Sequence, residues 1–140
     1  MTLIEVLEKI GIPLIAAFIG AVCAFTYNIR LQKHNDKKLV LATLMAFRFA
    51  GVYEVEFVKA LNMVDIVFYD NKKVRELLHK YYTYYSNSIY SGGHRVDTIF
   101  EMMFEMGKDI GYKELKQSDI KDFFTVSIRA NDLPTEGKEP

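Results

Sequence analysis

The stretch that decides the fold lies near the N-terminus: "IGIPLIAAFIGAVCAFTYNI", from Ile10 to Ile29. It contains twenty residues without a charge and is bracketed by Lys9 and Arg30. A helix of that length is about 30 Å long, which matches the thickness of the hydrocarbon core of a bilayer. A core helix of a small soluble protein rarely needs apolar residues on every face. We therefore expect residues 10–29 to form a single transmembrane helix.

The charges that flank this run predict its orientation. Before it, residues 1–9 hold Lys9 with Glu5 and Glu8, unlike the basic start of a cleaved signal peptide. After it, basic residues outnumber the single acidic Asp36, namely Arg30, Lys33, Lys37 and Lys38. The positive-inside rule then places residues 1–9 outside and the rest in the cytoplasm, which fits a bacterial inner membrane. A cleaved targeting signal and a buried helix of a soluble oligomer remain the alternatives.

Composition narrows the classes of protein. The chain has 140 residues, enough for one domain of ordinary size. Its 18 basic and 18 acidic residues balance, which argues against broad binding of nucleic acid. The single cysteine, Cys23, excludes an intrachain disulfide and a cysteine-rich zinc site. A reducing compartment therefore suits most of the chain.

Small residues recur at helical spacing inside the charge-free run. This small-residue stripe consists of Ala16, Ala17, Gly20, Ala21 and Ala24, with Asn28 one turn further on. Small side chains let two helix backbones approach closely in lipid, where dispersion and weak hydrogen bonds drive association. The stripe predicts a homo-oligomer, and a pore lined by the stripe and Asn28 is one version of it. A lone anchor whose small residues have no role is the alternative.

The remainder of the chain predicts an all-α fold, in which the transmembrane helix is followed by a small cytoplasmic helical bundle over residues 30–125. No proline occurs between Pro13 and Pro134. We expect the first helix to continue to about Gly51, a second over residues 54–69, and a third capped by Asp70 or Asn71. After a loop over residues 91–95, a fourth helix should end at Gly111 and a short one should cover residues 118–124. Residues 126–140 form a polar tail.

Three polar residues stand on otherwise apolar helices: Arg48, Asn62 and Asp65. A partly buried carboxylate needs a partner, so we expect Arg48 to pair with Asp65 while Asn62 bonds nearby backbone. Such a network would fix how the helices pack. The alternative is a contact with a ligand or a second subunit.

The segment "KYYTYYSNSIY" is rich in tyrosine. On a helix, Tyr81 and Tyr85 should be buried while Tyr82 and Tyr84 turn outward. Exposed tyrosines are typical of protein interfaces. We expect a surface for a cytoplasmic partner formed by Tyr82, Tyr84, Tyr90, His94 and Arg95. Ordinary packing and the stacking of a nucleotide base are the alternatives.

The sequence offers little chemistry. "ELLH" places Glu76 and His79 at the spacing used in di-iron bundles, but those sites need the motif twice. "SGGH" lacks the context of a phosphate loop, and Cys23 lies inside the apolar run. We therefore expect no enzyme, no catalytic residue, no cofactor and no metal ion.

Three separated segments resemble a bacterial family of short proteins whose function is unknown. The first segment, Leu-Met-x-x-Arg, matches Leu44, Met45 and Arg48. The second, Ala-Leu-Asn-x-Val-Asp ending in Phe-Tyr, matches Ala60, Leu61, Asn62, Val64, Asp65, Phe68 and Tyr69. The third, Met-x-x-x-Ile-Gly-Tyr, matches Met106, Ile110, Gly111 and Tyr112. The resemblance covers about residues 10–125 and departs at "FFTVSIRANDLP". It implies a membrane-anchored helical domain without a known reaction. The distribution of the family is compatible with mobile or defence-related genes.

Two functions follow from these expectations. In the first, the protein is a homo-oligomeric membrane effector, regulated through its cytoplasmic domain, that opens or disturbs the bilayer. In the second, it is a non-enzymatic anchor or adaptor that holds a cytoplasmic partner at the membrane.

Overall fold

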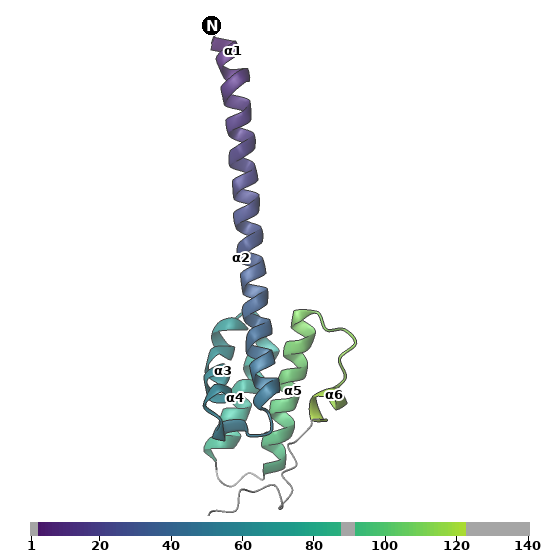
Figure 1. Ribbon diagram of the computed structural model, residues 1–140. Coiled ribbons are helices and arrows are strands. Elements are labelled where there is room, and N and C mark those ends of the chain that lie inside the picture. The colour runs from purple at the N-terminus through teal and green to yellow at the C-terminus, as the bar shows by residue number, and fades with distance from the viewer. Residues whose placement is uncertain (1–2, 88–91, 123–140) are drawn as a thin grey trace, which may run out of the picture.

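The N-terminal third of the chain is one long helical rod (Figure 1). In the computed structural model, which describes residues 3–87 and 92–122, the rod begins with α1 (Leu3–Val6) and a π-helical turn (Leu7–Gly11). It continues as α2 (Ile12–Phe47), an α-helix of 36 residues. Pro13 stands in the first turn of α2, where its missing N–H costs little. The expected continuation of the first helix beyond the charge-free run is confirmed.

Shorter helices follow the rod. A 3₁₀ turn (Gly51–Tyr53) leads to α3 (Val55–Val67), α4 (Lys72–Ser86), α5 (Gly92–Ile110) and α6 (Gln117–Lys121). Asn71 caps α4, as expected, because its side-chain oxygen accepts a hydrogen bond from the backbone N–H of Val74 at 3.1 Å. Gly51 and Gly111 have φ of +57° and +101°, a conformation that favours glycine and ends the preceding helix. The described residues contain no strand, so the fold there is all-α.

The lower part of α2 is the central helix of a helical domain, which we define as residues 40–122. In this domain α2 packs against α3 and α5, and α4 packs mainly on α5 (Figure 1). Every helix contributes to one core, with side chains such as Leu44, Val64, Val74, Met106 and Ile120 fully buried. Burial of these side chains provides the hydrophobic stabilisation of the domain.

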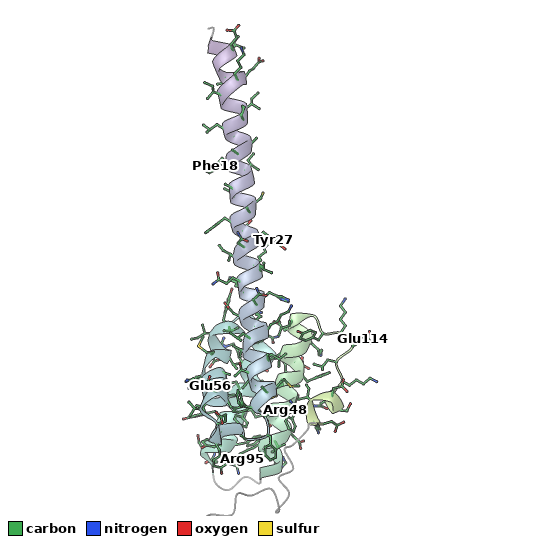
Figure 2. The ribbon with its side chains drawn as sticks, in the orientation of Figure 1. Phe18, Tyr27, Arg48, Glu56, Arg95 and Glu114 are labelled. Atoms are coloured by element: carbon green, nitrogen blue, oxygen red, sulfur yellow. The ribbon has the colours of Figure 1, made fainter. Side chains whose placement is uncertain are left out.

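The upper part of α2 packs against no other helix. The helix from Leu7 to Phe47 includes a stretch long and apolar enough to cross a membrane, and none of that stretch is buried. Figure 2 shows Phe18 and Tyr27 projecting from the rod well above the helical domain. The described part of the chain therefore does not cover the apolar side chains of this stretch.

Two expectations about the later elements need correction. The segment expected as a loop, residues 91–95, is helical from Gly92 onward, and Ser91 lies outside the described residues. Thr98 donates to the carbonyl oxygen of His94 at 2.8 Å within this first part of α5. Burial of Ile99 and Phe100 against the core offsets the low helix propensity of the two glycines. The last helix begins at Gln117 and ends at Lys121, while Phe124 and the tail lie outside the described residues.

The junction between the rod and the helical domain predicts a stability contrast. Leu44 is 0% exposed and Leu39, five residues earlier on the same helix, is 68% exposed. Leu44→Ala should lower the free energy of unfolding by about 2–5 kcal/mol, because it leaves a cavity in the core. Leu39→Ala should change it by less than about 0.5 kcal/mol. Thermal unfolding of the purified full chain in detergent measures both, and equal losses would contradict this placement of the core.

Candidate functional site

One ionic cluster joins three elements at the upper edge of the helical domain. The Nζ of Lys37 on α2 donates to Asp70 in the α3–α4 connection and to Asp109 near the end of α5, each at 2.8 Å. Asn71 donates through Nδ2 to the second oxygen of Asp109, also at 2.8 Å. Lys37 also lies 5.3 Å from the ring centroid of Phe68. We call Lys37, Asp70, Asn71 and Asp109 the Lys37 clamp.

The charges of the Lys37 clamp favour one another. Burial alone would lower the pKa of Lys37, but its hydrogen bonds to Asp109 and Asp70 outweigh this and raise the pKa above its usual value. The hydrogen bond from Lys37 lowers the pKa of Asp70. Lys37 and Asp70 are therefore ionised near neutral pH, and the clamp holds α2 in a fixed position relative to the α3–α4 connection and α5.

A hollow lies between α3 and α4, which make few contacts with each other. This α3–α4 groove has a volume of about 500 Å³. Apolar and aromatic side chains predominate in its lining, with a few polar groups: Val52, Val58, Leu61, Asn62, Asp65, Leu78, His79, Tyr81, Tyr82 and Tyr85. An apolar groove with few polar groups is typical of a site that accepts a ligand or a protein segment.

The expected pair of Arg48 with Asp65 is wrong. Asp65 accepts a hydrogen bond from Nε of Arg75 at 3.0 Å and lies 3.5 Å from Nε2 of His79, both on α4. Arg48 donates to the carbonyl oxygens of Met45 and Asp122, the latter at 2.9 Å, and so joins the end of α2 to the end of α6. Asp65 faces α4 because the chain turns between α3 and α4. This turn places Arg75, which follows Asp65 by ten residues, within hydrogen-bonding distance of the Asp65 carboxylate.

The third residue of that expected network, Asn62, is exposed and lines the α3–α4 groove with Asp65. The structure therefore divides the three residues between two places. Asn62 and Asp65 belong to the α3–α4 groove, and Arg48 belongs to the contact between α2 and α6.

The structure confirms only part of the expected arrangement of the tyrosines. Tyr81 is buried and Tyr82 is exposed, as expected. Tyr85, expected in the core, is 51% exposed, because the helical domain leaves the α3–α4 groove open beside it. Tyr84, expected to face outward, is half-buried, with its ring centroid 6.0 Å from that of His94 on α5. Tyr82 and Tyr85 therefore face the groove.

His94 and Arg95 complete the described part of the expected partner surface. Both stand on the first part of α5, where His94 lies beside Tyr84, and Figure 2 places Arg95 at the lower end of the helical domain. Tyr90 lies outside the described residues. The structure therefore brings together only part of that set.

All members of the small-residue stripe and Asn28 are exposed, and a Cβ atom added at Gly20 would meet no other atom within 4 Å. Residues 18 positions apart lie on the same side of an ideal α-helix, because they are separated by about five turns. Three residues of this side thus lie above three exposed residues of the helical domain: Gly20 above Lys38, Ala24 above Ala42, and Asn28 above Ala46.

The same spacing of 18 residues identifies the side of the rod that lies above the buried side of α2. Leu41 and Leu44 are buried in the core of the helical domain, and Cys23 and Thr26 lie 18 positions before them. The small-residue stripe therefore continues the side of α2 that the helical domain leaves open. We call this side, from Ala16 to Ala46, the outer face of α2.

The histidines do not gather. His79 lies beside Asp65, whereas Glu76 lies 3.8 Å from Lys72. Within residues 3–87 and 92–122, no group of three or more His, Cys, Asp or Glu side chains is placed to share a metal ion.

Comparison with known proteins assigns the chain to a family. Residues 1–126 match the sequence model of a family of unknown function, DUF6680. The chain belongs to this family. The match confirms the resemblance and extends it over the whole apolar rod and the helical domain. Neither the curated proteins nor the solved structures contain a match to the chain.

Several residues that carry the resemblance are structural. Among the residues matched to the family segments, six are buried in the core, namely Leu44, Ala60, Val64, Phe68, Met106 and Ile110. These six residues take part in the packing of α2, α3 and α5. Tyr69, which follows α3, is an exception because it is exposed and accepts a hydrogen bond from Nζ of Lys33 at 3.3 Å.

Sequence reasoning missed the Lys37 clamp. The sequence indicates Lys37 only as one of the positive charges that follow the apolar run, and it predicts no role for Asp109. The available signal was the position of Lys37 on the face of the helix that continues to Leu41 and Leu44, where a charged residue needs partners.

The Lys37 clamp predicts a specific loss of stability. Lys37 is 12% exposed, so Lys37→Met leaves two carboxylates without their cation and should cost about 1–2 kcal/mol of the free energy of unfolding. The control is Lys59→Met, because Lys59 is 66% exposed and its pair with Glu56 is on the surface. It should cost less than about 0.5 kcal/mol. Equal costs, measured by thermal unfolding of the full chain in detergent, would show that the clamp is an ordinary surface pair.

The pH dependence of that loss follows from the direction of the pKa shifts. A lowered folded-state pKa of Asp70 stabilises the fold above its ordinary value of 3.8, and this contribution disappears as the pH falls through the lowered pKa. A raised pKa of Lys37 stabilises the fold below 10.5 and is lost as the pH rises through the raised value. The difference between wild type and Lys37→Met should stay constant from about pH 5 to 9 and shrink below pH 3.8.

Proposed function

We propose that the protein is a single-pass membrane effector that self-associates through the outer face of α2 and acts on the bilayer under the control of its helical domain. Its N-terminus lies outside and the helical domain lies in the cytoplasm, as in a bacterial inner-membrane protein. The observation that carries the proposal is the continuity of α2. The same helix provides the apolar rod and the core of the helical domain.

The membrane assignment rests on length and exposure. Residues 10–29 would cross about 30 Å of hydrocarbon, and their apolar side chains face outward in the isolated chain. Exposed apolar side chains over this length are costly in water and favourable in lipid. The basic residues just after the run support the cytoplasmic placement of the helical domain.

Self-association is supported by the outer face of α2. Its upper part holds the small-residue stripe, which allows close contact between helices in lipid. Its lower part holds exposed Ala42 and Ala46, beside exposed Leu39. A second copy could therefore pack along the apolar rod, and at Lys38 and Ala42 it would also lie beside Tyr112 and Leu115, which line a hollow with these two residues. Asn28, near the cytoplasmic end of the span, would bring an amide to the helix contact.

Control by the helical domain is supported by the way α2 is held. The Lys37 clamp joins α2 to the α3–α4 connection and to the end of α5 only two turns below the end of the apolar run. A change in the α3–α4 groove can then alter the orientation of the apolar rod without an intervening flexible linker. A simple anchor does not require this rigid connection.

Replacement of Gly20 tests the effector. Gly20→Leu adds bulk to the small-residue stripe and meets nothing within its own chain. It should weaken self-association in detergent by about tenfold, as judged by analytical ultracentrifugation, and should abolish loss of membrane potential on overexpression. Thr26→Leu, on the opposite side of α2, is the matched control and should leave both properties intact. A wild-type protein that is monomeric, or that never depolarises cells, would contradict the effector.

A second function, the adaptor, is favoured by the α3–α4 groove. Its apolar lining and the exposed Tyr82 and Tyr85 suit a cytoplasmic protein partner. In this function α2 serves only to hold the groove at the membrane.

Site-specific crosslinking distinguishes the adaptor function from the effector function. A photoreactive amino acid at position 82 of the full-length protein in membranes should give an adduct with a different protein. The same probe at Tyr112, which is 48% exposed and follows α5 outside the lining of the groove, should not. Adducts between copies of the chain only, or equal adducts from both positions, would count against an adaptor.

A further inference from the structure

A second, smaller hollow lies where the rod enters the helical domain. It has a volume of about 190 Å³ and lies between α2, the α3–α4 connection and the end of α5. The α2 residues that line it share one face of the helix, namely Arg30, Lys33, His34 and Lys37. Tyr69, Asp70 and Asp109 line the other sides. The ends of α3 and α5 surround α2 at this level in Figure 1.

The position of this hollow relative to the bilayer follows from the length of the charge-free run in α2. The charge-free run ends at Ile29, so Arg30 to His34 begin about 1.5 Å and end about 7.5 Å beyond it along the helix axis. The headgroup layer on each side of a bilayer is about 5–8 Å thick. If residues 10–29 span the hydrocarbon, as the proposed function requires, Arg30, Lys33 and His34 lie among the lipid headgroups.

The charges in the hollow leave a cationic side for a ligand. Both carboxylates, Asp70 and Asp109, are hydrogen-bonded to Lys37. Among the residues that the structure describes, no carboxylate lies within ion-pairing distance of Arg30 or Lys33. The Nζ of Lys33 donates to the hydroxyl of Tyr69 at 3.3 Å, and that hydroxyl still has its own hydrogen to donate.

We propose that this hollow binds the phosphate of an anionic phospholipid headgroup. Arg30 and Lys33 supply the positive charges, and the hydroxyl of Tyr69 supplies a further hydrogen bond. Guanidinium and ammonium groups form short, charge-assisted hydrogen bonds with phosphate oxygens. The site deepens the proposed function, on which it rests, because it contacts both α2 and the α3–α4 connection. A bound headgroup thereby fixes the helical domain against the membrane surface beside the Lys37 clamp.

Lipid binding to the purified full-length protein in detergent tests the site. Native mass spectrometry should show that phosphatidylglycerol binds at least about tenfold more tightly than phosphatidylcholine. The double variant Arg30→Gln/Lys33→Gln should lose this preference. The matched control Lys59→Gln/Lys121→Gln removes the same charge from surface pairs with Glu56 and Asp97 and should retain it.

Several results would overturn the site: equal binding of the two lipids, an equal loss in the control variant, or complete displacement of the lipid by millimolar inorganic phosphate, which would make free phosphate the ligand. Extraction of membranes with alkaline carbonate separates this failure from failure of the proposed function. Release of the wild-type protein by carbonate would refute the membrane span and with it the headgroup site. Retention in the membrane without a preference for phosphatidylglycerol would refute the headgroup site alone.

Discussion

A single helix has to satisfy two different surroundings, and the rest of the structure depends on this constraint. The upper part of α2 is apolar and uncovered, whereas the lower part buries one side in the core of the helical domain. Because α2 is continuous from Ile12 to Phe47, the side buried below determines which side of the rod faces away from the helical domain above. The small-residue stripe falls on the side that stays open. The apolar rod and the helical domain thus share one rotational setting about the axis of α2.

The Lys37 clamp keeps this setting where α2 emerges from the helical domain. Its hydrogen bonds reach the α3–α4 connection and the end of α5, so all of these segments are fixed to the same point of α2. The α3–α4 groove lies on the far part of the domain, where Asp65 joins α3 to α4 through Arg75. A ligand or partner in the groove would act on helices that the clamp connects to the rod. This path supports the control that the proposed function assigns to the domain.

Local signals in the sequence predict most of the fold. The cap at Asn71 and the glycine at position 111 place helix ends, and the unbroken charge-free run predicts a long apolar helix, because each of these signals is local in the sequence. The partners of Lys37 could not be predicted in this way, since Asp70 and Asp109 lie 33 and 72 residues away. The assignment of Asp65 to Arg48 failed for the same reason: the choice between Arg48 and Arg75 depends on how α3 turns into α4. The exposure of Tyr85 likewise depends on the gap between α3 and α4, which no helical period reveals.

The most direct test of the shared rotational setting is a pair of insertions between Ile29 and Arg30. Two alanines rotate the small-residue stripe by about 200° relative to the helical domain, whereas four rotate it by about 40°. Self-association in detergent, measured by analytical ultracentrifugation, should be strongly weakened by two alanines and largely restored by four. Equal association in both variants, or a loss that grows with the number of alanines, would contradict a single continuous outer face of α2.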